Sequence, residues 1–160
     1  MAELNQYLKI LTESLEKKKK IMESILAANA RQGQAIREKG DLETFDRIVA
    51  EKEKLINDLM ALDNGFEEVY DRISAELVSR QSEFKTDIGK LQKLIAEIME
   101  LSARIQASEQ RNKQGVESYF SYTRRQLNQN RKSARAASDY YKSMNQLNTY
   151  NDVQMVDRKK

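Results

Sequence analysis

The spacing of the apolar residues constrains the fold more than any other feature of this chain. They recur every three or four positions from Leu4 to Ile36 and again from Leu42 to Leu77, which places them along one face of an α-helix. Proline is absent and there are only five glycines, so few positions oppose a helix. The spacing therefore predicts an all-α protein.

A turn is predicted at Lys39-Gly40-Asp41. Gly40 suits the left-handed backbone that often ends a helix, and Asp41 suits the N-cap of the next helix. We therefore expect a first helix over about residues 2–39 and a second over about residues 42–79, folded back on each other as a hairpin.

Folding the chain at this junction sets a register in which the numbers of facing residues add to 81. Apolar residues then face apolar residues in six pairs: Ile36 and Phe45, Leu26 and Leu55, Met22 and Leu59, Leu15 and Phe66, Leu8 and Ile73, Leu4 and Leu77. The same rule places Asn29 opposite Lys52 and Lys18 opposite Asp63. These polar pairs either form buried layers that fix the register or lie at the edge of the seam.

A third helix is expected over about residues 84–123, because two long helices alone leave much apolar surface in water. Its apolar face runs from Phe84 to Ile105, fades between Gln106 and Gly115, and returns at Val116. Running antiparallel to the second helix, it draws level with the Gly40 turn near Tyr122. The sequence thus predicts an elongated three-helix bundle, or coiled coil, over residues 1–123.

Residues 124–160 extend beyond this bundle as a basic, amphipathic C-terminal arm. From residue 111 onward the chain carries 11 basic and 4 acidic side chains, whereas residues 1–110 have a net charge of −4. A basic arm of this kind is either simply solvated or attracts nucleic acid or an anionic membrane surface. The arm itself is expected to be disordered, to fold back, or to bind another molecule.

The arm also has an apolar face, formed by Tyr140, Tyr141, Met144 and Leu147 at helical spacing. Tyrosine and methionine tolerate exposure and adapt to a partner surface, which favours a helix-in-groove contact with another protein. The alternative is that this face packs on the chain's own helices or on a second subunit. The sequence does not decide between the two.

Composition argues against most catalytic chemistry. The chain has no histidine, cysteine or tryptophan, and no glycine-rich loop for a nucleotide. We therefore expect no enzyme activity, no catalytic or metal site and no cofactor.

Residues 1–20 are amphipathic and highly charged, unlike a signal peptide or a membrane span, so a soluble cytoplasmic protein is expected.

Two segments resemble the FlgN family of flagellar export chaperones. They are the run from Glu38 to Ile56, with its Gly40-Asp41-Leu42-Glu43 turn followed by charged heptads, and the tail, with Ala136 to Lys142 and the closing residues Val156 to Lys160. Together with the long hairpin, the similarity covers nearly the whole chain. It is a similarity of layout rather than of a catalytic signature.

The resemblance implies a chaperone in the type III secretion pathway that builds the bacterial flagellum. Such a chaperone binds helical ends of hook–filament junction proteins, prevents their premature assembly, and delivers them to the export gate and its ATPase. The client-binding residues implied by this resemblance are Val116, Tyr119, Phe120, Tyr122, Leu127, Tyr140, Tyr141, Met144 and Leu147. Tyr150 or Tyr140 is the implied contact with the export gate.

Two other interpretations remain open at the level of sequence. One is a coiled-coil protein whose basic arm binds nucleic acid or a membrane surface, and the other is a structural coiled-coil spacer. Neither the client nor the oligomeric state, including a possible homodimer, follows from the sequence.

Overall fold

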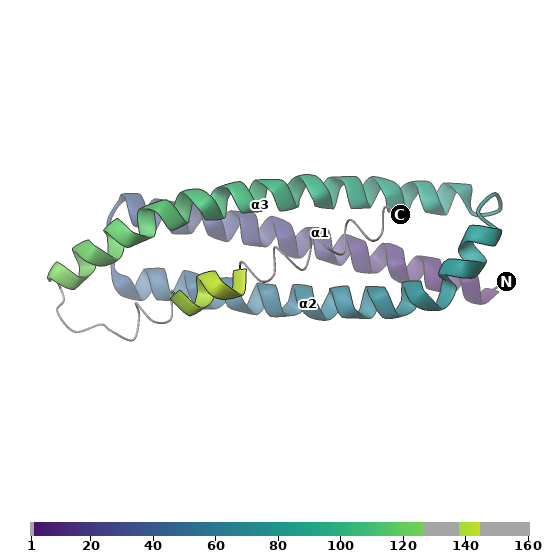
Figure 1. Cartoon of the computed structure of the whole chain (residues 1–160), viewed down its shortest axis with the longest axis horizontal. Helices are drawn as coiled ribbons and strands as arrows, with labels where there is room; N and C mark the ends of the chain where they lie inside the picture. The colour runs from purple at the N-terminus through teal and green to yellow at the C-terminus, as the bar shows by residue number, and fades with distance from the viewer. Residues whose placement is uncertain (1, 127–137, 145–160) are drawn as a thin grey trace.

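The computed structural model describes residues 2–126 and 138–144 of the chain. Three long helices follow one another, α1 (Ala2–Arg37), α2 (Leu42–Ser79) and α3 (Lys85–Gln126). They lie along one another as an elongated bundle (Figure 1). Residues 138–144 are helical, and we call them the docked segment. The expected all-α helical bundle is confirmed.

The turn between α1 and α2 differs from the expectation in one respect. Lys39, not Gly40, adopts the left-handed backbone, with a φ of 51°. The Gly40 amide donates to the carbonyl of Ala35 at 2.8 Å, and the Lys39 amide donates to that of Ile36 at 3.3 Å. This is a Schellman cap with lysine at its left-handed position. The Lys39 ammonium lies 4.5 Å from the centre of the Tyr122 ring, a cation–π contact that favours this conformation.

Asp41 begins α2 as the sequence predicts. Its backbone is extended, with φ −69° and ψ 156°, and its carboxylate accepts the Thr44 amide at 2.7 Å. This bond satisfies one of the amide groups that have no partner within the first turn of a helix. The direction of the chain therefore reverses at a turn that is capped on both sides.

The α2–α3 connection is held mainly by Arg80. Its guanidinium pairs with Glu76 and Glu83, each at 2.8 Å, and stacks 5.1 Å from the centre of the Phe84 ring. Phe84 is buried and closes this end of the core. The short polar link is thereby fixed without a proline or a glycine.

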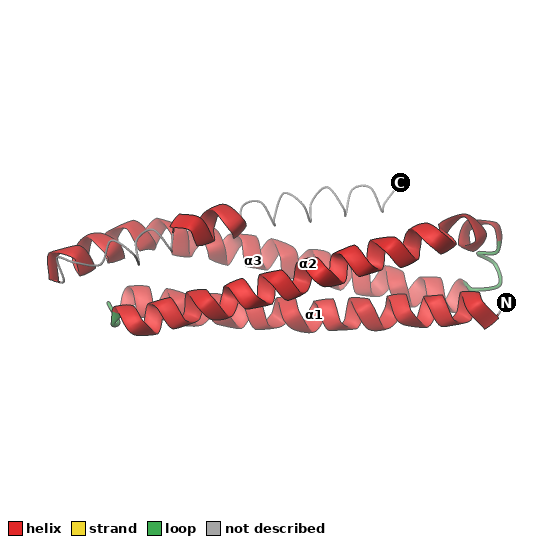
Figure 2. Ribbon diagram, turned by 90° about the horizontal axis from the view of Figure 1, so that it is seen from below, coloured by secondary structure: helices red, strands yellow, loops and turns green. Residues whose placement is uncertain are grey.

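α1 is the central helix, because it packs along both α2 and α3 while no comparable contact joins α2 to α3. Figure 2 shows α2 and α3 inclined to each other, so that they cross in this view. The main core combines residues from all three helices with two from the docked segment. Its fully buried members include Leu4, Leu8, Leu11, Met22, Ile25, Phe45, Leu59 and Ile98.

The polar pairs of the predicted register are buried, not at the edge of the seam. The Lys18 ammonium donates to Asp63 at 2.7 Å, which fixes the level at which α1 and α2 meet. Asn29 and Lys52 are also buried, at 1% and 0% exposure. They do not bond to each other, because Asn29 donates to Ser108 of α3 and Lys52 donates to Gln32 and Glu109.

α3 reaches the level of the first turn, as the sequence predicts. The Tyr119 hydroxyl donates to the carbonyl of Gly40 at 2.8 Å. Its ring stacks on Phe45, 4.9 Å between centroids, and Phe120 meets Phe45 edge-on at 5.2 Å. The last third of α3 is therefore joined to the start of α2 by an aromatic cluster.

Candidate functional site

The docked segment lies between α2 and α3. These two helices each pack along α1 but not along each other, which leaves room for it. Figure 1 shows it beside α2, and its side chains reach α3 as well. Tyr140 and Met144 are 0% and 1% exposed. They stand four residues apart, one above the other on the same helical face. The docked segment thus fills the groove between α2 and α3 with one apolar face of a helix.

Tyr140 closes a buried cluster of polar groups contributed by all three long helices. Its hydroxyl donates to Glu109 Oε1 of α3 at 2.7 Å. The same carboxylate oxygen accepts a hydrogen bond from Lys52 of α2, in a buried ion pair. The Lys52 ammonium also donates to Gln32 of α1 at 2.9 Å and lies 4.3 Å from the centre of the Tyr140 ring. We call Gln32, Lys52, Glu109 and Tyr140 the latch cluster.

Burial shifts the titration of this cluster. It lowers the pKa of the Lys52 ammonium from its ordinary value to about 8, although the Glu109 carboxylate pulls that pKa upward. Burial, reinforced by Glu109, also raises the pKa of the Tyr140 hydroxyl far above its usual range. Tyr140 therefore keeps its proton at physiological pH and remains a hydrogen-bond donor to Glu109.

Asn112 of α3 and Asn29 of α1 add further buried polar groups beside the latch cluster. The Asn112 amide donates to the carbonyl of Asn29 at 2.9 Å and to Gln32 at 3.2 Å. Four buried polar atoms here have no hydrogen-bond partner among the described residues. They are Asn29 Oδ1, Gln32 Nε2, Glu109 Oε2 and the Tyr141 hydroxyl oxygen. The groove is therefore polar as well as apolar, and it can accept further hydrogen bonds.

The structure divides the expected client-binding residues into three groups. Val116, Tyr119, Phe120, Tyr140 and Met144 are buried. Tyr122 and Tyr141 are partly exposed. Leu127, Leu147 and the expected export-gate residue Tyr150 lie outside the described residues.

The sequence leaves open whether the apolar face of the arm packs on the chain's own helices or on a partner. The structure decides this for the described part of the arm, because Tyr140 and Met144 are sealed within the chain's own core. The physical reason is that α1 alone packs along both other helices, so the space between α2 and α3 accommodates a fourth element. The docked segment therefore packs on the chain's own helices and not on a partner.

Sequence reasoning missed Gln32, Lys52 and Glu109 as parts of one site. The stretch from Gln106 to Gly115 reads as a place where the apolar face fades, but Ser108, Glu109 and Asn112 within it are buried. Their spacing of three and four residues was the available signal, since it continues the helical face in polar form. A polar core segment of this kind is hidden from a pattern that counts only apolar residues.

The described residues hold no group of three or more acidic side chains arranged to bind a metal ion. Nor does any helix within 2–126 or 138–144 combine the length and apolar character needed to cross a membrane.

Comparison with known proteins identifies one family. The profile of the family described as FlgN protein matches residues 1–149. No curated protein and no solved structure matches the chain.

Proposed function

Because the chain belongs to the FlgN family of flagellar export chaperones, we propose that it binds the helical ends of hook–filament junction proteins. In this proposal it acts in the cytoplasm, keeps those ends from assembling early, and delivers them to the export gate and ATPase of the type III pathway. It does so as a binding protein, without catalysing a reaction.

The observation that supports this proposal is the docked segment itself. The groove between α2 and α3 already holds one amphipathic helix, through a tyrosine and a methionine four residues apart. A client helix with two anchors at the same spacing fits the same groove. The anchor nearer the latch cluster should carry a hydrogen-bond donor, because Glu109 and its neighbours are buried polar groups that need a partner.

The described part of the docked segment is anchored by two buried side chains, Tyr140 and Met144, while Lys142 and Ser143 between them are exposed. A client helix that places similar anchors in the groove and also contacts more of α2 and α3 competes with the segment for the same surface.

Release of the segment also bears on delivery. While Tyr140 is buried against Glu109 it offers no surface to an export gate. Displacement by a client exposes it, so that a loaded chaperone presents a tyrosine that an empty one hides. In this way one exchange both captures the client and marks the complex for export.

The test is a titration of the intact protein with synthetic helical termini of junction proteins, measured by calorimetry. Tyr140→Ala removes the main anchor of the docked segment and should tighten client binding about tenfold, because the competing helix is released. Lys142→Ala, at an exposed position of the same segment, serves as the matched control and should leave affinity unchanged. Absence of binding to every junction-protein terminus overturns the proposed function. Equal affinities for wild type and Tyr140→Ala would place the client elsewhere on the chain.

A further inference from the structure

The Lys52 ammonium is enclosed by side chains from three other elements. Gln32 of α1 offers a neutral amide oxygen and Glu109 of α3 offers a carboxylate, and both accept hydrogen bonds from it. The docked segment places the Tyr140 ring over the ammonium, 4.3 Å from the ring centre. Lys52 is 0% exposed with the segment in place. Of these three neighbours only Tyr140 lies outside the long helices, so contact of Lys52 with water depends on docking.

Docking disfavours the charge of Lys52 in two ways. The Tyr140 ring takes the place of water on one face of the ammonium, and loss of water penalises a charged group. The Tyr140 hydroxyl donates at 2.7 Å to Glu109 Oε1, the oxygen that also accepts from Lys52, so the carboxylate shares its charge between two donors. Burial lowers the pKa of Lys52 to about 8, and the loss of water therefore outweighs the attraction of Glu109.

We propose that docking of residues 138–144 drives a proton from Lys52 into water, so that the segment is held more tightly as the pH rises. The state that binds fewer protons is favoured at higher pH, and here that state is the docked one. The neutral amine keeps two N–H groups, enough for its bonds to Gln32 and Glu109, so the latch cluster persists without the charge. When the segment leaves, water returns to Lys52 and the amine takes the proton back.

Other ionisable groups around the ammonium limit the pH range of this effect. Glu109 of α3 pairs with Lys52 directly, while Glu53 of α2 and Tyr141 of the docked segment act on Tyr140. Burial raises the pKa of both tyrosines in the docked state. Above about pH 10 the tyrosines of the released segment therefore ionise first, which opposes docking. The tightening is expected between about pH 7 and 9.5.

The pKa of Lys52 bounds the size of the effect. A docked segment that caused the whole change from 10.5 to about 8 would raise the docking constant about thirtyfold between pH 7 and 9.5. The long helices share in burying Lys52, so we expect a rise of at least about threefold within that limit. Only the consequence for client exchange rests on the proposed function: a competing client helix should enter the groove more readily near pH 7 than near pH 9.5.

The experiment titrates Lys52 in the intact protein by NMR of 13C-labelled lysine side chains, without any client. The Lys52 signal is identified by its loss in Lys52→Met. Tyr140→Ala with Met144→Ala removes both buried anchors and releases the segment, while Ser143→Ala changes an exposed residue of the same segment. Lys52 should titrate near pH 8 in wild type and in Ser143→Ala. In the double variant it should titrate at least about 0.5 pH units higher, which corresponds to about threefold in the docking constant.

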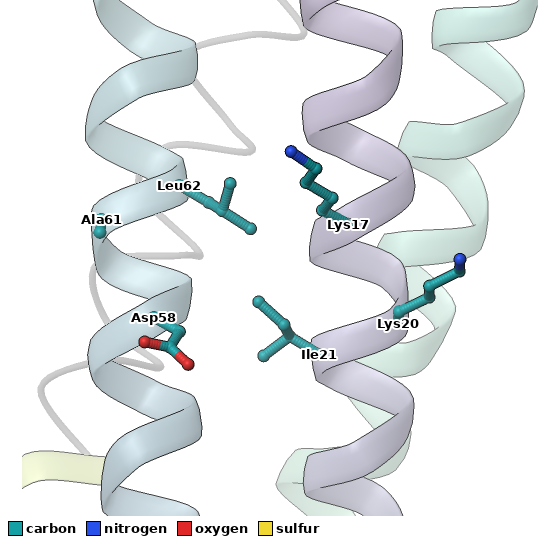
Figure 3. Close-up of a pocket in the computed structure, with 6 residues that line it drawn as sticks. All are labelled: Lys17, Lys20, Ile21, Asp58, Ala61 and Leu62. Atoms are coloured by element: carbon teal, nitrogen blue, oxygen red, sulfur yellow. The ribbon is translucent and has the colours of Figure 1, made fainter.

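Other lysines in the same spectra are internal controls. Lys17 and Lys20 lie on α1 beside an open hollow of about 520 Å³ between α1 and α2 (Figure 3). Lys18 between them is buried against Asp63. Neither the lining of the hollow nor the Lys18–Asp63 pair includes a residue of the latch cluster. These three lysines should therefore titrate alike in wild type and in the double variant.

A second measurement follows docking itself and needs no destabilised variant. In urea that releases part of the segment while the long helices stay folded, the 13C-methyl signal of Met144 reports the docked and released populations. Their ratio should rise at least about threefold between pH 7 and 9.5 in wild type and in Lys54→Met, a change at an exposed neighbour, and stay constant in Lys52→Met.

Two results overturn the proposal. One is a Lys52 midpoint in the double variant that falls or rises by less than about 0.5 pH units. The other is a docked-to-released ratio that fails to rise with pH in wild type, or that rises equally in Lys52→Met. If the double variant does not fold, the Met144 measurement decides alone. Neither measurement involves a client, so failure of the proposed function leaves both outcomes unaffected.

Discussion

Lys52→Met should change how the stability of this protein depends on pH. Lys52 is fully buried, and burial lowers its pKa from 10.5 to about 8 in the folded chain. The unfolded chain therefore binds a proton at this position that the folded chain has lost between about pH 8 and 10.5. Stability rises with pH wherever the unfolded state binds more protons, so this lysine makes the wild type more stable as pH increases through that window.

The size of the effect follows from the two pKa values. Between pH 7 and pH 9.5 the contribution amounts to about 2 kcal/mol, since one pKa unit corresponds to about 1.4 kcal/mol. Above about pH 10 the tyrosines oppose it. The pKa values of Tyr140 and Tyr141 are raised in the folded chain, so the unfolded chain loses those protons first and stability falls. The useful window therefore ends near pH 9.5.

Urea denaturation followed by circular dichroism measures the effect at a series of pH values. The free energy of unfolding of wild type, minus that of Lys52→Met, should rise by about 2 kcal/mol between pH 7 and 9.5. Tyr140→Ala should reduce the rise, because the Tyr140 ring covers the ammonium. Parallel pH curves for wild type and Lys52→Met would refute the inference that Lys52 titrates in a buried cluster.

Four further substitutions test other parts of the structure. Tyr140→Phe keeps the ring but removes the hydrogen bond to Glu109, and should weaken docking of residues 138–144 by about 1.5–3 kcal/mol, measured as faster amide hydrogen exchange in that segment. Gly115→Ala should lower the melting temperature, because the added Cβ would lie 2.8 Å from a side-chain atom of α1. Gly89→Ala should raise the melting temperature, because it adds helix propensity and its Cβ meets no atom within 4 Å. Asp41→Ala should cost about 1 kcal/mol of unfolding free energy by removing the cap of α2, while a change below about 0.3 kcal/mol would mean that the cap contributes little.

Most of the fold was predictable because it depends on local patterns. Helical spacing and the absence of proline define three long helices, and the Gly40-Asp41 junction defines where the first reversal occurs. The register rule even identifies the buried pair of Lys18 and Asp63. These features follow from backbone geometry and from which side chains share a helical face, and a single sequence displays both.

The site was less predictable because it depends on the space between helices. Nothing in the spacing of α2 or α3 shows that the two do not pack along each other, so the groove that receives Tyr140 and Met144 is invisible in the sequence. Glu109 lies in a stretch that reads as exposed, yet it is buried by a segment about 30 residues further along the chain. The left-handed Lys39 is a similar case, since Tyr122 stabilises it from another helix.

In the proposed function, a client helix takes the place of residues 138–144 between α2 and α3. Hydrogen exchange of the intact protein, with and without a junction-protein terminus, tests it directly. With client bound, the amides of residues 138–144 should exchange faster, while those of α2 around Lys52 should stay protected or become more so. If residues 138–144 remain as protected in the saturated complex as in the free chain, the client does not bind in this groove and the account is wrong.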